Sequence, residues 1–416
     1  MRSVRDYYLV LASQTLSAFG DNAFLMFIIG QLTQQQLSGT ISSAQYSSSN
    51  ALYTAMLYIP FVLLAPVAGY VNDRFAKTRW LLGGNGIKLL GVAVALGGLH
   101  AGQNWLGSGY LLIGIGACVY SPAKYGILPE LLPPERLVKA NGTMEMLTLA
   151  AILVGNLAGA LLIDTYPLLL CLNLLFIIIA GAMLLNVLMA VSPRHPEVKF
   201  ARTLGDFRSN TRALVTSPRL GRVLLGTGLF WFCGSVLKTN FSPWGLGPLG
   251  FRDGFSWSLL GFSAELGATT QIALLGLWLA VGVMAGSMLA GQFYRTGDVH
   301  ATRRWGWVMA ALIVVLIGTT GPLPVKVMLI LIGIAGGLFL IPLNATLQAE
   351  CQRGALGKTI ATQNFLENCV MLAGAGLVYA AAGAGVGPRG IFAGLACCLA
   401  GAVCLLRIPP AADRPC

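Results

Sequence analysis

Long apolar runs alternate with short polar or charged breaks along the whole of this 416-residue chain. An apolar stretch of about 20 residues can cross the hydrocarbon core of a bilayer as a helix. Apolar residues make up 56% of the chain and charged residues only 10%. The pattern therefore predicts an all-α integral membrane protein with twelve transmembrane helices, at residues 8–32, 47–71, 79–100, 106–130, 138–163, 167–191, 221–246, 270–292, 305–321, 326–348, 358–382 and 389–407.

Basic residues are distributed unevenly between the two predicted sides of the membrane. Of the 27 Lys and Arg residues, 21 fall on one side, and the opposite loops hold only Arg252, Lys326 and Arg389. Because cytoplasmic loops are enriched in Lys and Arg, both termini are predicted to be cytoplasmic. The net charge of +12 is thus mainly a topology signal, and it does not favour nucleic-acid binding.

The long basic connection 192–220 divides the chain into two halves with six predicted spans each, at residues 1–191 and 221–416. Corresponding spans repeat weakly, since Pro122 precedes Glu130 by eight residues and Pro342 precedes Glu350 by eight residues. Polar residues at matching positions of two halves are typical of transporters built from repeats. The connection itself fits either a helix resting on anionic lipid or a simple tether.

Six charged residues lie inside the predicted spans, at least six residues from either end: Asp21, Lys88, Lys124, Glu145, Lys238 and Glu367. A charge at the bilayer centre costs roughly 2.5–3.5 kcal/mol, so together they oppose insertion by roughly 15–20 kcal/mol before pairing. Such a cost indicates function. Three acids and three lysines predict a polar cavity for a ligand that carries both charges.

One pair of these charges suggests a mechanism. Asp21 and Lys238 lie at similar depths in corresponding spans, so we expect them to meet when a cavity closes and to separate or bind a ligand when it opens. A permanent structural ion pair is the alternative. The span that carries Lys88 is expected at the periphery, and Lys88 is left out of the predicted site.

Residues 69–79 read GYVNDRFAKTR. This segment resembles the signature of the major facilitator superfamily, G-x-x-x-D-R-x-x-[RK]-x-[RK], in the loop between the second and third spans. The resemblance implies a fold of two six-helix halves that rock about a central site. It also implies a cytoplasmic conformational latch formed by Gly69, Asp73, Arg74 and Lys77, whereas a turn placed by the positive-inside rule is the structural alternative.

Within that superfamily, the chain resembles the bacterial lysophospholipid transporters over nearly its whole length. The segments that carry the resemblance are FGDNAF at 19–24, SPAKYGILPE at 121–130 and LVKANGTME at 137–145. The family implies inward flipping of lysophosphatidylethanolamine and related lysolipids across the bacterial inner membrane. It further implies re-acylation by a cytoplasmic acyltransferase/acyl-carrier-protein synthetase, and the superfamily implies a monomer.

A headgroup with a phosphate and an ammonium suggests roles for the charged and amide residues. Lys124 and Lys238 are assigned to the phosphate, and the ammonium is assigned to Asp21, Glu145 and Glu367. Neutral hydrogen bonds are assigned to Asn22, Asn141, Asn240, Asn344 and Asn364, although each asparagine alone more often joins helices. A local pair between Lys124 and Glu145 is nearly as well supported as a headgroup site.

Two other classes of protein were weighed against a lipid transporter. A proton-coupled exporter of amphipathic drugs would also use buried acids, but three buried lysines would repel cationic drugs. An enzyme is disfavoured because the sequence contains no nucleophile or His–acid pair suited to acyl transfer, and no catalytic residue, cofactor or metal is expected. Proton coupling, sodium coupling and uncoupled exchange all fit the sequence.

Overall fold

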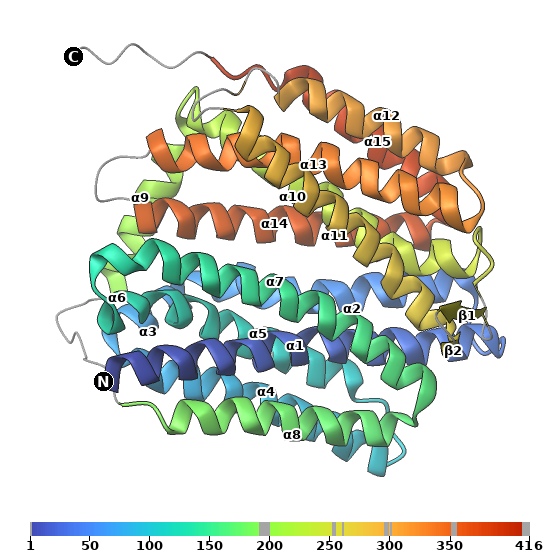
Figure 1. The fold of residues 1–416 in the computed structure, drawn as a ribbon, viewed down its shortest axis with the longest axis horizontal. Coiled ribbons are helices and arrows are strands. Elements are labelled where there is room, and N and C mark those ends of the chain that lie inside the picture. The colour runs from blue at the N-terminus through green and yellow to red at the C-terminus, as the bar shows by residue number, and fades with distance from the viewer. Residues whose placement is uncertain are drawn as a thin grey trace. The chain divides into compact units, whose positions relative to one another are not determined.

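The computed structural model describes residues 2–190, 200–251, 255–259, 262–294, 299, 302–350 and 356–409 (Figure 1). This part of the chain is almost entirely helical. Its helices are α1 (Arg2–Leu37), α2 (Ser43–Leu63), α3 (Ala65–Arg74), α4 (Lys77–His100), α5 (Leu106–Gly126), α6 (Leu128–Leu131), α7 (Pro134–Thr165), α8 (Leu168–Val187), α9 (Phe200–Thr216), α10 (Leu220–Leu246), α11 (Ala268–Phe293), α12 (Thr302–Gly318), α13 (Pro322–Glu350), α14 (Leu356–Gly383) and α15 (Pro388–Leu405).

Nine of the helices among the described residues are long and apolar enough to cross a membrane. The remaining predicted spans lie in α1, in α2 with α3, and in α12. The all-helical membrane fold is confirmed, and the count of twelve spans stays a prediction. Helices suit a bilayer because their backbone hydrogen bonds are satisfied within the segment.

Prolines interrupt two predicted spans that the apolar pattern presented as continuous. The span 47–71 breaks at Leu64, between α2 and α3, and a proline occupies the first turn of α3. The span 106–130 breaks at Ile127, just before the short helix α6, which also has a proline in its first turn. A proline lacks the N–H that would continue the preceding helix, so each break follows from the residue type.

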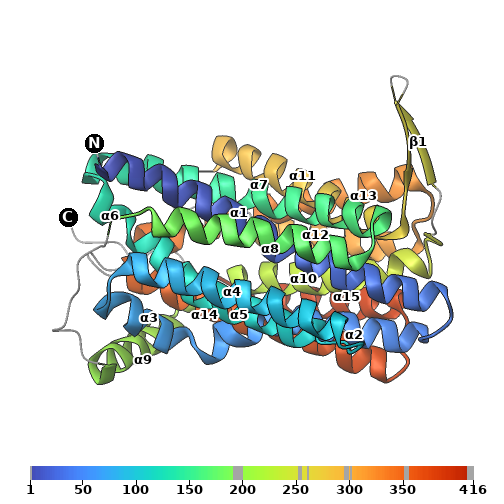
Figure 2. The ribbon, with the colours of Figure 1, turned by 90° about the horizontal axis from the view of Figure 1, so that it is seen from below.

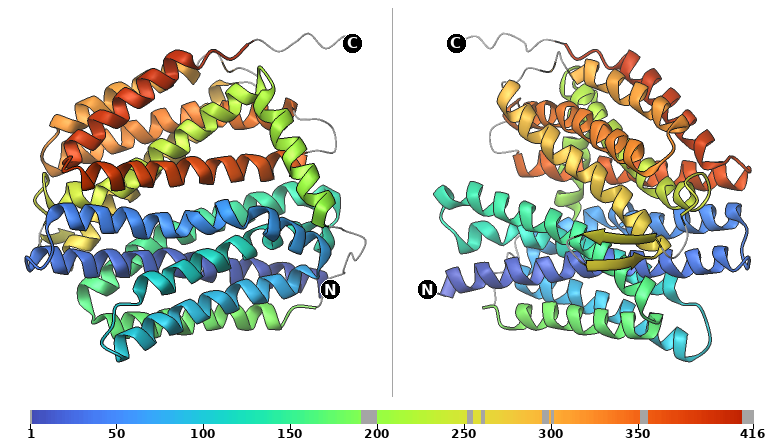
Figure 3. Two further views of the ribbon diagram at one scale, coloured as in Figure 1. Left: turned by 180° about the vertical axis from the view of Figure 1, so that it is seen from behind. Right: turned by 45° about the vertical axis from the view of Figure 1, so that its right-hand side comes forward.

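The chain forms two compact units, which we describe separately. Unit 1 contains Met1–Thr40, Tyr53–Gly205 and Arg252–Ala273. In this unit α1 packs against α7 and α8, and α4 packs against α5 and α8 (Figures 1 and 3). Added Cβ atoms at Gly91 and Gly109 would each lie 2.5 Å from the other residue's carbonyl oxygen, so these glycines allow the backbones of α4 and α5 to approach closely.

Unit 2 contains Ile41–Leu52, Asp206–Phe251 and Leu274–Cys416. Here α10 packs against α13, α14 and α15, and α12 packs against α13 and α15. The aromatic residues Trp244 and Phe392 meet edge to face in its core. The connection predicted at 192–220 contains helix α9, whose Phe207 contacts Phe365 of α14. Residues 217–219 connect α9 to α10.

Two segments join the unit formed mainly by the other half of the sequence. The start of α2 belongs to unit 2, where Asn50 donates a hydrogen bond to the carbonyl of Thr239. The segment Arg252–Ala273, which includes the start of α11, belongs to unit 1, where Asp164 accepts hydrogen bonds from the backbone N–H and hydroxyl of Thr270. The domain boundaries predicted at residues 191 and 221 stay a prediction.

A β-hairpin precedes α11, and the apolar pattern did not predict it. Strands β1 (Phe255–Leu259) and β2 (Phe262–Leu266) pair antiparallel, with Phe255 opposite Leu266 (Figure 2). Strands of five residues are too short for a hydropathy pattern to separate them from a loop. The hairpin adds no span to the helical fold.

Candidate functional site

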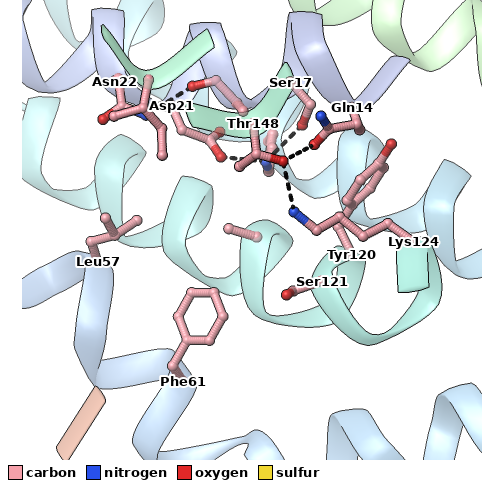
Figure 4. Close-up of a pocket in the computed structure, with 14 residues that line it drawn as sticks. Gln14, Ser17, Asp21, Asn22, Leu57, Phe61, Tyr120, Ser121, Lys124 and Thr148 are labelled. Carbon is pink, nitrogen blue, oxygen red and sulfur yellow. Dashed lines mark hydrogen bonds and ion pairs between the residues drawn. The ribbon is translucent and has the colours of Figure 1, made fainter. Parts of the chain in front are cut away.

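A cavity opens inside unit 1 among α1, α2, α4, α5 and α7 (Figure 4). Its volume is about 170 Å³, below the roughly 300–1,000 Å³ of pockets that enclose whole ligands. The cavity can therefore hold one polar group of a larger molecule. Its lining comprises Gln14, Ser17, Ala18, Asp21, Asn22, Leu57, Phe61, Lys88, Ala117, Tyr120, Ser121, Lys124, Thr148 and Ile152.

Helix α1 supplies one wall of the cavity. Its five lining residues follow the helical pattern i, i+3, i+4, i+7 and i+8, which places them on one face of the helix: Gln14, Ser17, Ala18, Asp21 and Asn22. The Asn22 amide donates to the carbonyl of Ala18 in its own helix, at 2.9 Å. The predicted residues Asp21 and Asn22 thus share this cavity with Lys124.

Lys88 forms an ion pair with Asp21, which corrects the prediction that Lys88 lies away from the cavity. Its Nζ lies 2.6 Å from Oδ2 of Asp21, and the lysine is only 1% exposed. The same ammonium donates to the hydroxyl of Ser17 at 2.7 Å and lies 5.5 Å from the centre of the Tyr120 ring. Asp21 and Lys88 are therefore a buried pair in the wall of the cavity.

The reason for this placement lies in the contact between α4 and α5. Gly84, Lys88 and Gly91 follow one another at helical spacing on the same face of α4. A Cβ added at Gly116 of α5 would lie 2.6 Å from the Lys88 side chain, so this glycine leaves room for the lysine stem. Hydropathy alone could not show which helix this face of α4 meets.

Lys124 lines the cavity from α5. Its ammonium lies 3.5 Å from the hydroxyl of Thr148 and 4.7 Å from the centre of the Tyr125 ring. Thr148 is in turn 3.0 Å from the amide oxygen of Gln14 (Figure 4). The described lining of the cavity thus contains two ammonium groups and one carboxylate, whose formal charges sum to +1. Such a site attracts an anionic group.

One oxygen of the site has no partner in the described part of the chain. Oδ2 of Asp21 accepts from Lys88, while the buried Oδ1 accepts no hydrogen bond from any described residue. A buried carboxylate oxygen without a donor is costly, and a ligand with an N–H group would satisfy it. The described cavity wall therefore presents ammonium groups beside an acceptor to which no described residue donates.

Unit 2 carries a separate polar cluster around Glu367, which is 7% exposed. Gln363 donates to Oε1 of Glu367 at 2.7 Å and to Oδ1 of Asn344 at 2.8 Å. The predicted residues Asn344 and Glu367 are thus linked through Gln363, which the sequence argument did not include. Asn364 lies on the exposed face of α14, away from this cluster.

Two further predicted residues of unit 2 lie on α10. Lys238 makes no hydrogen bond or ion pair with any described residue of its own unit, and its pairing with Asp21 stays a prediction. Asn240 is fully buried and donates to the carbonyl of Pro388 at 2.8 Å, a bond that joins α10 to the start of α15. This contact is the helix-joining role that the sequence argument gave as the alternative for each asparagine.

Several predicted side chains lie outside the described residues. Asn141 and Glu145 belong to the backbone of α7, and Gly69 and Asp73 to α3, but their surroundings are not described. Their assigned roles remain predictions.

The described members of the predicted latch make local contacts. Arg74 donates to the hydroxyl of Tyr70 at 2.8 Å. Lys77 forms an ion pair with Glu130 at 2.5 Å, and in unit 2 the guanidinium of Arg219 binds both carboxylate oxygens of Glu350 at 2.7 and 2.8 Å. Glu130 and Glu350, which follow the repeated prolines, therefore each form an ion pair within their own unit.

The sequence pattern did not identify Gln14, Ser17, Thr148, Gln363 or Lys88 as site residues. A signal for Ser17 was present, because Ser13, Ser17 and Asp21 recur every four residues on one face of α1. No comparable spacing marked Thr148 or Gln363. Uncharged polar residues are common in membrane helices, so single examples carry little information.

Curated relatives match this chain over most of its length. The lysophospholipid transporter LplT of Serratia proteamaculans is 35% identical over 382 residues, which cover 90% of this chain and 87% of the relative. The protein of the same name from Klebsiella pneumoniae (strain ATCC 700721 / MGH 78578) is 33% identical over 409 residues, covering 96% and 94%. Both similarities extend across the two six-span halves predicted from the sequence.

Solved structures support the same fold. A POT family transporter in complex with 5-aminolevulinic acid matches with a TM-score of 0.70 at 15% identity, over 96% of this chain and 94% of that one. The human organic anion transporter MFSD10 matches with a TM-score of 0.67 at 16% identity, over 98% and 100%. The family profile of the Major Facilitator Superfamily covers residues 10–375. The chain belongs to the Major Facilitator Superfamily and, within it, to the same family as the LplT proteins.

Proposed function

We infer that this chain is a lysophospholipid transporter that moves lysophosphatidylethanolamine and related lysolipids inward across the bacterial inner membrane. The observation that carries the inference is the 35% identity over 90% of the chain to relatives that bear this name. The cavity of unit 1 supports it chemically, since two lysines and a carboxylate with one oxygen that accepts from no described residue suit a headgroup that carries both charges.

In the proposed binding mode the phosphate lies between Lys88 and Lys124, and an ammonium donates to Oδ1 of Asp21. Lysine binds phosphate as a point charge, whereas carboxylates accept from ammonium. The acyl chain lies outside the cavity, because a volume of about 170 Å³ accommodates a headgroup fragment only. The large apolar side chains of the lining are Leu57, Phe61 and Ile152.

Alternating access completes the proposed mechanism. The two halves rock about the central charges, and Lys238 and the Gln363–Glu367 cluster supply the contribution of unit 2. Asn141 and Glu145 retain their proposed headgroup roles. At the cytoplasmic side, Asp73 and Arg74 act as the latch, and a cytoplasmic acyltransferase/acyl-carrier-protein synthetase consumes the delivered lysolipid. Both termini lie in the cytoplasm, and the protein works as a monomer.

The test is uptake of labelled lysophosphatidylethanolamine into spheroplasts that also contain the acyltransferase, with and without this protein. We expect protein-dependent conversion to diacyl lipid that Asp21→Ala and Lys124→Ala abolish. Asn173→Ala is the matched control, because Asn173 is exposed on α8 and donates only to the carbonyl of Leu169 in its own helix. Absence of conversion despite normal membrane insertion would refute the proposal and favour a proton-coupled drug exporter.

A further inference from the structure

A chain of buried hydrogen bonds leads from α8 to the ammonium of Lys88. The amide oxygen of Asn186 accepts from the amide nitrogen of Asn85 at 2.8 Å. The amide oxygen of Asn85 accepts from the hydroxyl of Ser17 at 2.8 Å, and the oxygen of Ser17 accepts from Lys88 at 2.7 Å. Asn186, Asn85, Ser17 and Lys88 are each at most 3% exposed. Such a buried network holds its members in one arrangement.

The direction of donation in this chain is fixed by the groups at its ends. An ammonium can only donate, and a hydroxyl has a single proton. Because Ser17 gives that proton to Asn85, its lone pairs face Lys88. The amide nitrogen of Asn85 donates to Asn186, which orients the amide so that its oxygen, the only acceptor of the group, faces the hydroxyl of Ser17.

Two pairs of polar residues, one on α4 and one on α1, face each other where these helices meet. Asn85 and Lys88 lie one turn apart on α4, and Ser17 and Asp21 lie one turn apart on α1. A lysine has a flexible four-carbon stem, and two acceptors one turn apart fix its ammonium where a single acceptor would not. Without a correctly turned Ser17, Asp21 would be the remaining hydrogen-bond acceptor of Lys88 among the described residues, and both cavity-facing groups would lose their fixed positions.

We propose that Asn85 and Asn186 are positioning residues for transport: they turn Ser17 toward Lys88 and so hold the Lys88–Asp21 pair in the orientation that receives the headgroup. Neither asparagine lines the cavity, so both act through other residues. The proposal rests on the proposed lysolipid transport, and it assigns a role in binding to two residues that would otherwise only join helices.

The experiment measures initial rates of lysophosphatidylethanolamine uptake against concentration for the wild type, Asn85→Leu and the matched control Asn173→Leu. Leucine has nearly the shape of asparagine but neither donates nor accepts a hydrogen bond. We expect Asn85→Leu to raise KM about tenfold, which corresponds to about 1.4 kcal/mol, with the maximal rate per inserted protein within about twofold of wild type. Asn173→Leu should match the wild type.

A second variant protects the test against a folding defect. Asn186→Ala disturbs the chain one bond farther from Lys88, so its KM should rise by a smaller factor. An unchanged KM in both variants would overturn the proposal, as would a loss of inserted protein in both, which would indicate a purely structural role. Absence of uptake by the wild type would instead remove the proposed function, and the positioning role with it.

Discussion

Replacing Lys88 by methionine should destabilise the protein strongly, because it leaves the Asp21 carboxylate buried without its counter-ion. The two side chains are 2% and 13% exposed, so solvent screens this pair very little. Breaking a buried ion pair by removing one partner costs about 3–5 kcal/mol. Met fills nearly the same space as Lys, so we attribute most of the expected loss to the unpaired charge rather than to a cavity.

The same reasoning predicts that a second substitution restores stability. Lys88→Met combined with Asp21→Leu removes both charges, and exchange of a buried pair for apolar residues is often neutral, so the free energy of unfolding should return to within about 1 kcal/mol of wild type. Reversible unfolding in mixed micelles with SDS, followed by tryptophan fluorescence, measures these differences. Lys326→Met is the control, because Lys326 lies over the Trp278 ring and has no described ion pair. A double variant no more stable than Lys88→Met would refute the reasoning.

Two further predictions concern packing and charge. Gly155→Val should reduce the amount of folded protein sharply, because a Cβ at Gly155 would lie 2.5 Å from the carbonyl oxygen of Phe19. Gly181→Val is the control and should be neutral, because a Cβ at Gly181 has no heavy atom within 4 Å. Size-exclusion chromatography in detergent measures the amount of folded protein for both variants. Arg219→Lys should lower the free energy of unfolding by about 1 kcal/mol, because lysine cannot reproduce the forked bond to Glu350; equal stability in the SDS assay would contradict this.

The location of the cavity was only partly predictable. The charges inside the spans identified Asp21 and Lys124 as candidate site residues, because a buried charge is rare enough to be informative. Lys88 met the same criterion, yet the fold argument placed its helix at the periphery and excluded it. Lys88 nevertheless lines the cavity, because the glycines of α4 and α5 bring these helices close together and Lys88 is turned toward α1.

The sequence by itself determined the membrane-helical class, the approximate helix positions and the family, because apolar run length, proline positions and local motifs are readable along one chain. The tertiary structure decided which charges meet. Pairing depends on how each helix is rotated and how closely its neighbour approaches, and those quantities are set by contacts between distant segments. Thus Asp21 and Lys88, separated by 67 residues, form an ion pair that the sequence around either residue does not indicate.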